Sequence, residues 1–112
     1  MAINYSMTKE SEKILRKAFF NFYDHVYDSW KKLSDTYKRH EDISDLDLEK
    51  FFLYEDKSNS LEAEMLEECI WHISRNTPVA SHLRFIISII YSISDLERMA
   101  DYVISIARYL NQ

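Results

Sequence analysis

Residues 77–110 read TPVASHLRFIISIIYSISDLERMADYVISIARYL, and this stretch carries the strongest structural signal in the chain. It contains one proline, Pro78, close to its start, and no glycine. Its isoleucines would suit a β-strand, but a run of about thirty residues without a turn signal is far too long for one strand. Thr77 is a good helix N-cap and Pro78 a good first helical residue. The stretch therefore predicts one helix from Pro78 to about Leu110.

Two further helices are predicted before this one. The second begins at about Ser44, where Ser44 and Asp47 approximate a capping box, and it ends near Arg75. The first runs from about Thr8 to Lys38, and its apolar residues recur at steps of three and four, the spacing of one helical face: Leu15, Phe19, Phe22, Val26, Trp30, Leu33 and Tyr37. Because almost nothing joins the second helix to the third, the two should form an antiparallel hairpin. The sequence thus predicts an all-α fold, an elongated antiparallel three-helix bundle.

The composition agrees with a single domain over residues 1–112. Apolar residues make up 46% and charged residues 29%, a balance typical of a soluble globular protein. Glycine is absent from the whole sequence. Tight hairpins and phosphate-cradling loops depend on glycine, so nucleotide-binding α/β folds and tight β-sandwiches are disfavoured.

The charge pattern limits the classes of partner. The formal net charge is −5 and no basic block is present, so we expect no nucleic-acid partner. The single cysteine, Cys69, excludes an intramolecular disulfide and fits a reducing compartment. The uncharged stretch 85–94 is about half of the ~20 residues that a membrane span needs, and the N-terminal residues lack the apolar segment of a secretory signal. We therefore expect a cytoplasmic protein that is at most peripheral to the membrane.

Polar side chains interrupt the predicted apolar stripes of the second and third helices. The stripe of the second helix follows Leu48, Phe52, Leu66, Ile70 and Ile73, and that of the third helix follows Ile86, Ile90, Ile93 and Ile104. At about 100° per residue, Glu55 and Asn59 fall within about 20° of the centre of the second helix's stripe. On the third helix, Glu97 and Asp101 fall about 20° and about 60° from the centre. If the chain reverses about Pro78, Glu55 faces Asp101 and Asn59 faces Glu97. Three carboxylates and one amide are thus predicted at one level of the bundle.

Such a cluster of bare acids would be unfavourable, because the carboxylates repel one another and lose solvation. A divalent or trivalent cation relieves the repulsion, since oxygen ligands four residues apart on facing helices form a chelate. Because no histidine joins the set, Mg, Mn or Fe fits better than structural zinc. The alternative from periodicity alone is that the acids are solvated or pair with Arg16, Arg84 or Arg98.

Two other spacings allow a metal ligand but favour a plainer role. Asp24 and Asp28 lie beside the apolar stripe of the first helix, which favours a solvated face over a supporting metal ligand. Cys69 and His72 are spaced like two zinc ligands, but no second such pair exists. A buried thiol and an ordinary histidine are therefore favoured.

Residues 77–84, TPVASHLR, and residues 94–101, SDLERMAD, resemble the PhoU family of phosphate-uptake regulators. The third helix of that family opens with a P-V-A-x-x-L-R signature and carries D-L-E-R-x-x-D about thirteen residues later. Residues 55–62, EDKSNSLE, are similar to the E-x-x-x-D/N-x-L-E segment of the family's second helix. The resemblance covers about residues 48–110. Ala100 stands where the family usually has glycine.

The resemblance implies a three-helix bundle whose paired E(D)xxxD motifs hold a surface metal cluster. Glu97 with Asp101 would form one motif, and Glu55 with Asn59 the other. Asn59 departs from the acidic form and removes one negative charge. The resemblance also implies a non-catalytic regulator of phosphate uptake and phosphate-responsive signalling. The implied partners are the phosphate ABC transporter and a sensor histidine kinase.

Members of this family usually contain two bundles in tandem, whereas this chain has one. The first helix offers Phe20, Tyr23, Tyr27 and Trp30, an excess of apolar surface that usually marks an interface. We therefore expect a homodimer that recreates the tandem. Two alternatives are a metal-free helical interaction module and an enzyme that uses the metal cluster for phosphate chemistry. The enzyme would need a general base, and the sequence identifies none.

Overall fold

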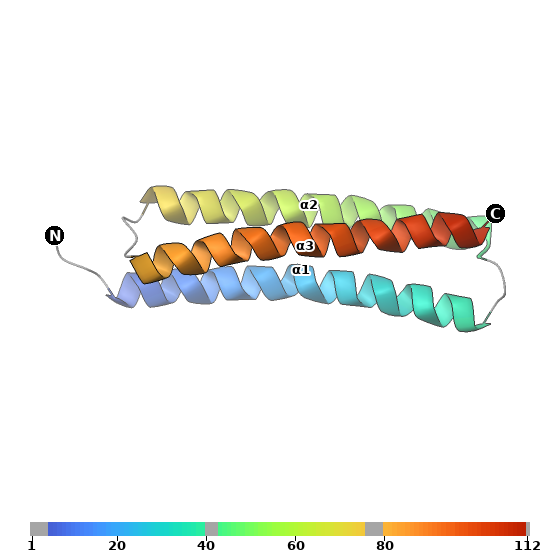
Figure 1. Ribbon diagram of the computed structural model, residues 1–112, viewed down its shortest axis with the longest axis horizontal. Coiled ribbons are helices and arrows are strands. Elements are labelled where there is room, and N and C mark those ends of the chain that lie inside the picture. The colour runs from blue at the N-terminus through green and yellow to red at the C-terminus, as the bar shows by residue number, and fades with distance from the viewer. Residues whose placement is uncertain (1–4, 40–42, 76–79, 112) are drawn as a thin grey trace.

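The computed structural model describes residues 5–39, 43–75 and 80–111, which form three long helices side by side (Figure 1). Helix α1 spans Tyr5–Arg39, α2 spans Asp45–Arg75 and α3 spans Ala80–Asn111. Helix α2 runs antiparallel to α1 and α3, and the molecule measures 62 × 19 × 16 Å (Figure 1). The prediction of an elongated antiparallel three-helix bundle is confirmed. The predicted helix start at Pro78 lies outside the described residues.

Helix α2 begins as its sequence predicts. The backbone N–H of Asp47 donates to the Ser44 hydroxyl over 3.1 Å, and the N–H of Leu48 donates to the Ser44 carbonyl over 2.9 Å. These bonds satisfy donors that the first turn of a helix would otherwise leave free. The Ser44 hydroxyl in turn donates to the Asp47 carboxylate over 2.9 Å. Ser44 is therefore the N-cap. In a full capping box the side chain of Asp47 would bond to the backbone N–H of Ser44, whereas here it accepts from the Ser44 hydroxyl.

Two clusters of buried apolar side chains form the core. The larger cluster fills the half of the bundle where α1 begins, and Leu15, Phe22 and Ile86 are fully buried in it. The smaller cluster fills the other half and gathers Leu33, Ile43, Phe51, Val103, Ile104 and Ala107. Trp30 packs against both clusters and joins them. The core is thus continuous along the bundle.

The end of the bundle where α2 begins is closed by backbone and amide hydrogen bonds. The N–H of Ile43 donates to the Leu110 carbonyl over 3.2 Å, and the Asn111 side-chain amide donates to the Ile43 carbonyl over 2.7 Å. Ile43 itself is buried, with 2% of its surface exposed. These contacts tie the end of α3 to the segment before α2.

The buried stripe of α2 differs from the predicted one. Its members recur at heptad spacing with one addition, and they are Phe51, Ser58, Met65, Cys69 and His72. Ile70, which was expected to be buried, is 61% exposed. On a helical wheel the observed stripe is turned by roughly 90° from the predicted one. The prediction weighted large aliphatic residues, whereas this stripe includes two polar residues, Ser58 and His72.

Candidate functional site

The four predicted metal ligands lie at the border of the α2–α3 contact rather than inside it. Glu55 and Glu97 are half-buried, whereas Asn59 and Asp101 are exposed. Because the buried stripe of α2 is rotated relative to the predicted one, Asn59 faces solvent instead of the core. Within the described helices, no hydrogen bond or ion pair joins Glu55 or Asn59 to Glu97 or Asp101.

Glu97 is the electrostatic centre of this region. Its Oε2 atom is buried and has no hydrogen-bond partner among the described residues. Burial, followed by repulsion from the nearby carboxylates of Glu62 and Asp101, raises the pKa of Glu97 to about 8. The protonated acid can also donate to Glu62 or Asp101, which favours the neutral form. At pH 7, Glu97 therefore carries a proton in the absence of a cation.

Glu62 was not among the predicted ligands, and helix geometry explains why it is the partner of Glu97. Side chains lean toward the N-terminus of their own helix, so directly opposed residues of two antiparallel helices lean apart. Glu62 lies about one turn beyond Asn59 on α2. Because Glu62 and Glu97 lean toward each other along the two helices, their carboxylates lie close together. Arg108 reaches the Phe52 ring with a similar offset along the two helices, with its guanidinium 4.9 Å from the ring centre.

The donor chemistry of Glu62, Glu97 and Asp101 suits a hard cation, because all three offer carboxylate oxygens. In the part of the chain that the structure describes, however, no group of three or more His, Cys, Asp or Glu side chains is gathered closely enough to hold a metal ion. The unpartnered Oε2 of Glu97 is the atom that would gain most from a cation. The described side chains therefore present donors of the right kind without a closed coordination shell.

The two weaker metal signals lie in different surroundings. Asp24 and Asp28 are exposed on α1. Cys69 is fully buried, and burial raises the pKa of its thiol to about 11, with a smaller contribution from Glu68. A thiol that stays protonated at neutral pH is a poor nucleophile and a poor metal ligand.

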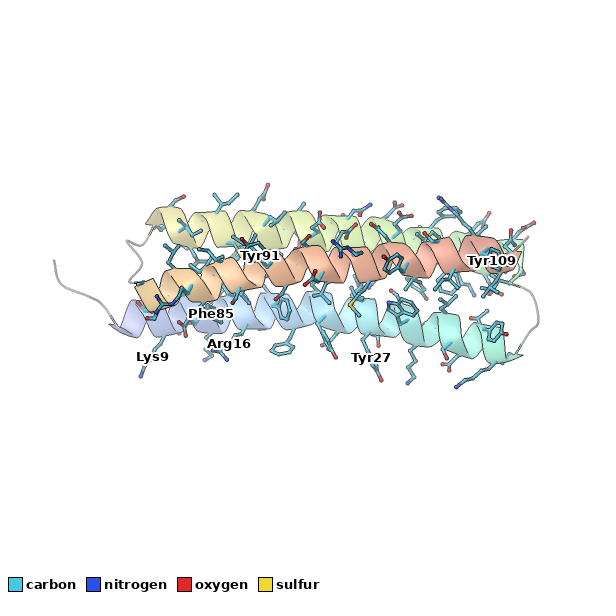
Figure 2. The ribbon with its side chains drawn as sticks, viewed as in Figure 1. Lys9, Arg16, Tyr27, Phe85, Tyr91 and Tyr109 are labelled. Carbon is cyan, nitrogen blue, oxygen red and sulfur yellow. The ribbon has the colours of Figure 1, made fainter. Side chains whose placement is uncertain are left out.

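An apolar groove runs between α1 and α3. It encloses about 220 Å³ and is lined by Tyr23, Val26, Tyr27, Trp30, Leu96 and Met99. Tyr23 and Tyr27 stack with their ring centres 6.5 Å apart, and Figure 2 shows Tyr27 projecting outward from α1. The Trp30 indole N–H donates to the Met99 carbonyl over 3.0 Å, which fixes the floor of the groove. This groove contains three of the aromatic residues that predicted an interface on the first helix.

Neither α1, α2 nor α3 is long and apolar enough to cross a membrane within the described residues. The helices, the Glu97 region and the groove thus define the class of this protein: a three-helix bundle with acids at the border between α2 and α3.

The PhoU domain model matches residues 6–110, and the chain belongs to the PhoU family. The uncharacterised protein MG409 of Mycoplasma genitalium is 37% identical over 113 residues, which cover 96% of this chain and 48% of that protein. The phosphate-specific transport system accessory protein PhoU homologue of Pseudomonas aeruginosa is 44% identical over 54 residues, which cover 48% of this chain and 22% of that protein. The chain spans about half the length of the relatives that match it from end to end. No solved structure matches it at a significant level.

Proposed function

We propose that this protein is a non-catalytic regulator of phosphate uptake and of phosphate-responsive signalling. The match of the PhoU domain model to residues 6–110 carries the proposal. A relative in Pseudomonas aeruginosa is named as an accessory protein of a phosphate-specific transport system, which supports the phosphate ABC transporter as partner. We place the protein in the cytoplasm, where it would act on the transporter and on a sensor histidine kinase.

We further propose that the border of α2 and α3 binds Fe, Mn or Mg, as a single ion or a multinuclear cluster. Glu97 and Asp101 would be the principal ligands, with Glu55 and Asn59 completing the second motif. The buried, unpartnered Oε2 of Glu97 supports a cation here, because a positive charge would replace the proton that the carboxyl otherwise needs. Glu62 adds a carboxylate beside Glu97 and is a further candidate ligand.

The combined variant Glu97→Ala with Asp101→Ala is expected to lose metal binding while keeping its helicity. The measurement is metal per chain by elemental analysis after incubation with Fe, Mn or Mg, beside far-ultraviolet circular dichroism. Asp24→Ala with Asp28→Ala is the matched control, since it removes another acidic pair four residues apart on an exposed helix face. Undiminished metal in the Glu97 and Asp101 variant would end the proposal of this site.

The same two variants test the regulatory role in cells that lack this protein. Such cells are expected to take up more labelled phosphate in phosphate-rich medium than cells with the wild-type chain. The Asp24 and Asp28 variant is expected to restore the restraint and the Glu97 and Asp101 variant to fail. If the wild-type chain itself has no effect on uptake, the proposed function is wrong regardless of the metal result.

We propose that a second copy of the chain covers the groove between α1 and α3. The groove is apolar, and its residue Tyr27 has 57% of its surface exposed to solvent. Exposed apolar surface of this kind is typical of interfaces. The relatives are about twice as long as the matched segment, so each has room for a second unit of similar size. A two-fold dimer would supply such a unit here.

Tyr27→Glu is expected to shift the protein from dimer to monomer, because it places a charge in the middle of the groove. The measurement is sedimentation velocity at micromolar concentrations. Tyr91→Glu is the matched control, since Tyr91 is 71% exposed on α3 and does not line the groove. A wild-type chain that sediments as a strict monomer would contradict the proposal, and so would equal dissociation of both variants.

A metal-free helical interaction module is the second candidate. The exposure of Asn59 and Asp101 favours it, because solvated polar groups need no cation. The elemental analysis separates the two functions: a wild-type chain without bound metal after incubation supports the metal-free module.

A further inference from the structure

A second groove lies between α1 and α2, near the end of the bundle where α2 ends. It encloses about 600 Å³, and its lining combines two apolar residues, three acids and a histidine: Ile14, Trp71, Glu64, Glu67, Glu68 and His72. No lysine or arginine is among the described residues that line it. We call it the acidic groove. It is separate from the border of α2 and α3 around Glu97 and from the apolar groove between α1 and α3.

The acidic groove exposes a large apolar side chain on each of its walls. Trp71 on α2 is 50% exposed, and Ile14 on α1 is 40% exposed. The Arg75 guanidinium lies over the Trp71 ring, 5.0 Å from its centre, so this indole already pairs with a cation from its own helix. Tryptophan is enriched among the residues that dominate the binding energy of protein interfaces. The walls therefore match an occupant that carries both apolar and cationic groups.

The acids of this groove are only partly compensated by positive charge. Glu68 has His72 as its partner, with Oε1 of the acid 3.0 Å from Nε2 of the ring. Glu64 and Glu67 are exposed, and among the described residues no ion pair or hydrogen bond joins either carboxylate to another side chain. Arg75 places one positive charge beside three carboxylates. The resulting negative potential attracts a cationic partner.

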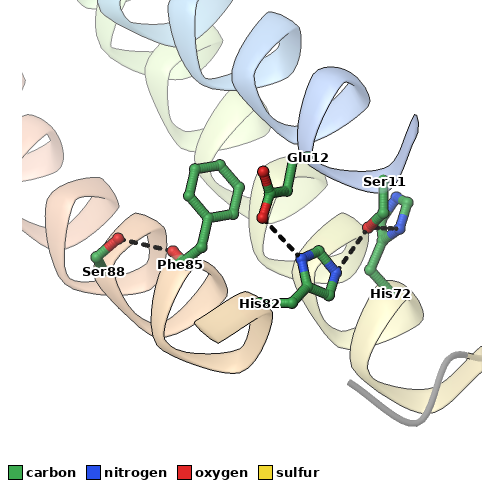
Figure 3. A network of polar contacts seen from close by, with 6 residues as sticks. All are labelled: Ser11, Glu12, His72, His82, Phe85 and Ser88. Carbon is green, nitrogen blue, oxygen red and sulfur yellow. Dashed lines mark hydrogen bonds and ion pairs between the residues drawn. The ribbon is translucent and has the colours of Figure 1, made fainter. Parts of the chain in front are cut away.

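The floor of the acidic groove is held by contacts that cross the bundle. His72 is buried, and its Nδ1 lies 2.7 Å from the hydroxyl oxygen of Ser11 on α1. The same oxygen lies 3.1 Å from Nε2 of His82 on α3, so Ser11 stands between the two imidazoles (Figure 3). The Trp71 ring meets the His72 ring edge to face, with the centres 5.0 Å apart. The groove is thus formed in the free chain, which lowers the entropic cost of binding.

The opposite end of α1 carries the opposite charge. A cavity of about 390 Å³ there is lined by Lys32, Asp35, Lys38 and Arg39. Because the cations in this lining outnumber the acid, it repels a basic partner, whereas the acidic groove attracts one. The two cavities therefore determine which end of the rod such a partner approaches.

We propose that the acidic groove docks one basic amphipathic helix of a partner protein. Two antiparallel helices form a linear trough, and a helix with one apolar face packs along such a trough. The apolar side chains of the partner helix contact Ile14 and Trp71, and its lysine or arginine side chains pair with Glu64 and Glu67. The acidic lining disfavours a nucleic acid or an anionic membrane surface as the occupant. This docking needs neither a bound metal nor the apolar groove between α1 and α3.

The probe for this proposal is a synthetic helical peptide of about 18 residues, with leucine along one face and arginine on the rest. Its binding to the full chain is followed by fluorescence anisotropy. Trp71→Ala is expected to weaken binding about tenfold, because it removes the apolar anchor. Glu64→Gln with Glu67→Gln is expected to weaken binding about fivefold and to reduce its dependence on salt.

Asp24→Asn with Asp28→Asn is the matched control, since it removes the same charge from exposed positions of α1 that do not line the acidic groove. This variant is expected to bind the peptide as the wild type does. A second peptide of the same composition, with its leucines scattered around the helix, is expected to bind more weakly. Equal binding of the two peptides, equal losses in the groove and control variants, or no binding of the amphipathic peptide would each overturn the proposal.

Nitrogen-15 NMR of the two tryptophan indoles gives a reading on the wild-type chain. The Trp71 indole N–H signal is expected to shift as the amphipathic peptide is added. The Trp30 indole N–H donates to the Met99 carbonyl beside the apolar groove between α1 and α3, and its signal is expected to stay in place. A shift of the Trp30 signal alone would place the peptide in that other groove and overturn the proposal, and so would the absence of any shift.

Discussion

Phe22→Ala is expected to lower the free energy of unfolding by about 3–5 kcal/mol, which is the usual loss for a fully buried phenylalanine. Phe22 is 0% exposed and lies in the larger core cluster, so the substitution removes apolar contacts from all sides and leaves a cavity. The expected loss is a large part of the total stability of a domain of this size. Urea unfolding followed by far-ultraviolet circular dichroism measures it.

Phe20→Ala is the matched control for this prediction. Phe20 lies two residues earlier on the same helix and is 55% exposed, with edge contacts to the rings of Phe19 and Tyr23. We expect a loss of about 1 kcal/mol or less, because its ring is already largely in solvent. Similar losses for the two variants would contradict the assignment of the buried face of α1.

Glu97→Gln is expected to stabilise the metal-free protein increasingly as the pH rises. The pKa of Glu97 is about 8 in the folded chain, above the ordinary value of 4.5, because of burial and the carboxylates of Glu62 and Asp101. Between these two values the unfolded chain loses a proton that the folded chain keeps, so the stability of the wild type falls with pH. Glutamine has no proton to lose and keeps the shape of the neutral acid.

The expected gain from Glu97→Gln is on the order of 1–2 kcal/mol at pH 9. The full difference in pKa would give more, but Glu97 is only half-buried and solvent screens the repulsion. The measurement is urea unfolding in the presence of a chelator, from pH 4 to pH 9. Below pH 4.5 the wild type and the variant should coincide, which is the internal control. A gain that does not depend on pH would contradict the raised pKa.

The helices could be predicted because their signals are local. The three-and-four spacing around Phe22 and the cap at Ser44 each act within a few residues. The structure confirms the cap and most of the predicted stripe of α1, but Tyr37, the last residue of that stripe, is 56% exposed. The antiparallel hairpin of α2 and α3 followed from the short connection alone. Local rules therefore gave the elements and their order.

The candidate site was harder to predict because it depends on which side of α2 faces the core. Ser58 and His72 lie in the buried stripe, and a hydrophobic pattern cannot anticipate polar residues there. The resulting rotation exposes Asn59. The lean of the side chains then brings Glu62, one turn away, against Glu97. A prediction that counted this lean would have included Glu62 in the site.

The contacts of Ser11 with His72 and His82 could not be predicted from spacing at all. Ser11 is 61 residues from His72 and 71 residues from His82, and each side chain comes from a different helix. Among the described residues, the only polar partner of either histidine within its own helix is Glu68, four residues before His72. Only the packing of three helices brings these groups together.

The two ends of this bundle are closed by different chemistry. Ile43, Leu110 and Asn111 close one end through amide groups that do not titrate near neutral pH, and a row of ionisable side chains closes the other. The contacts at the Ile43 end join α3 to the segment before α2, whereas Ser11, His72 and His82 join all three helices at the other end. The two ends of this rod-shaped bundle are thus held together by different contacts.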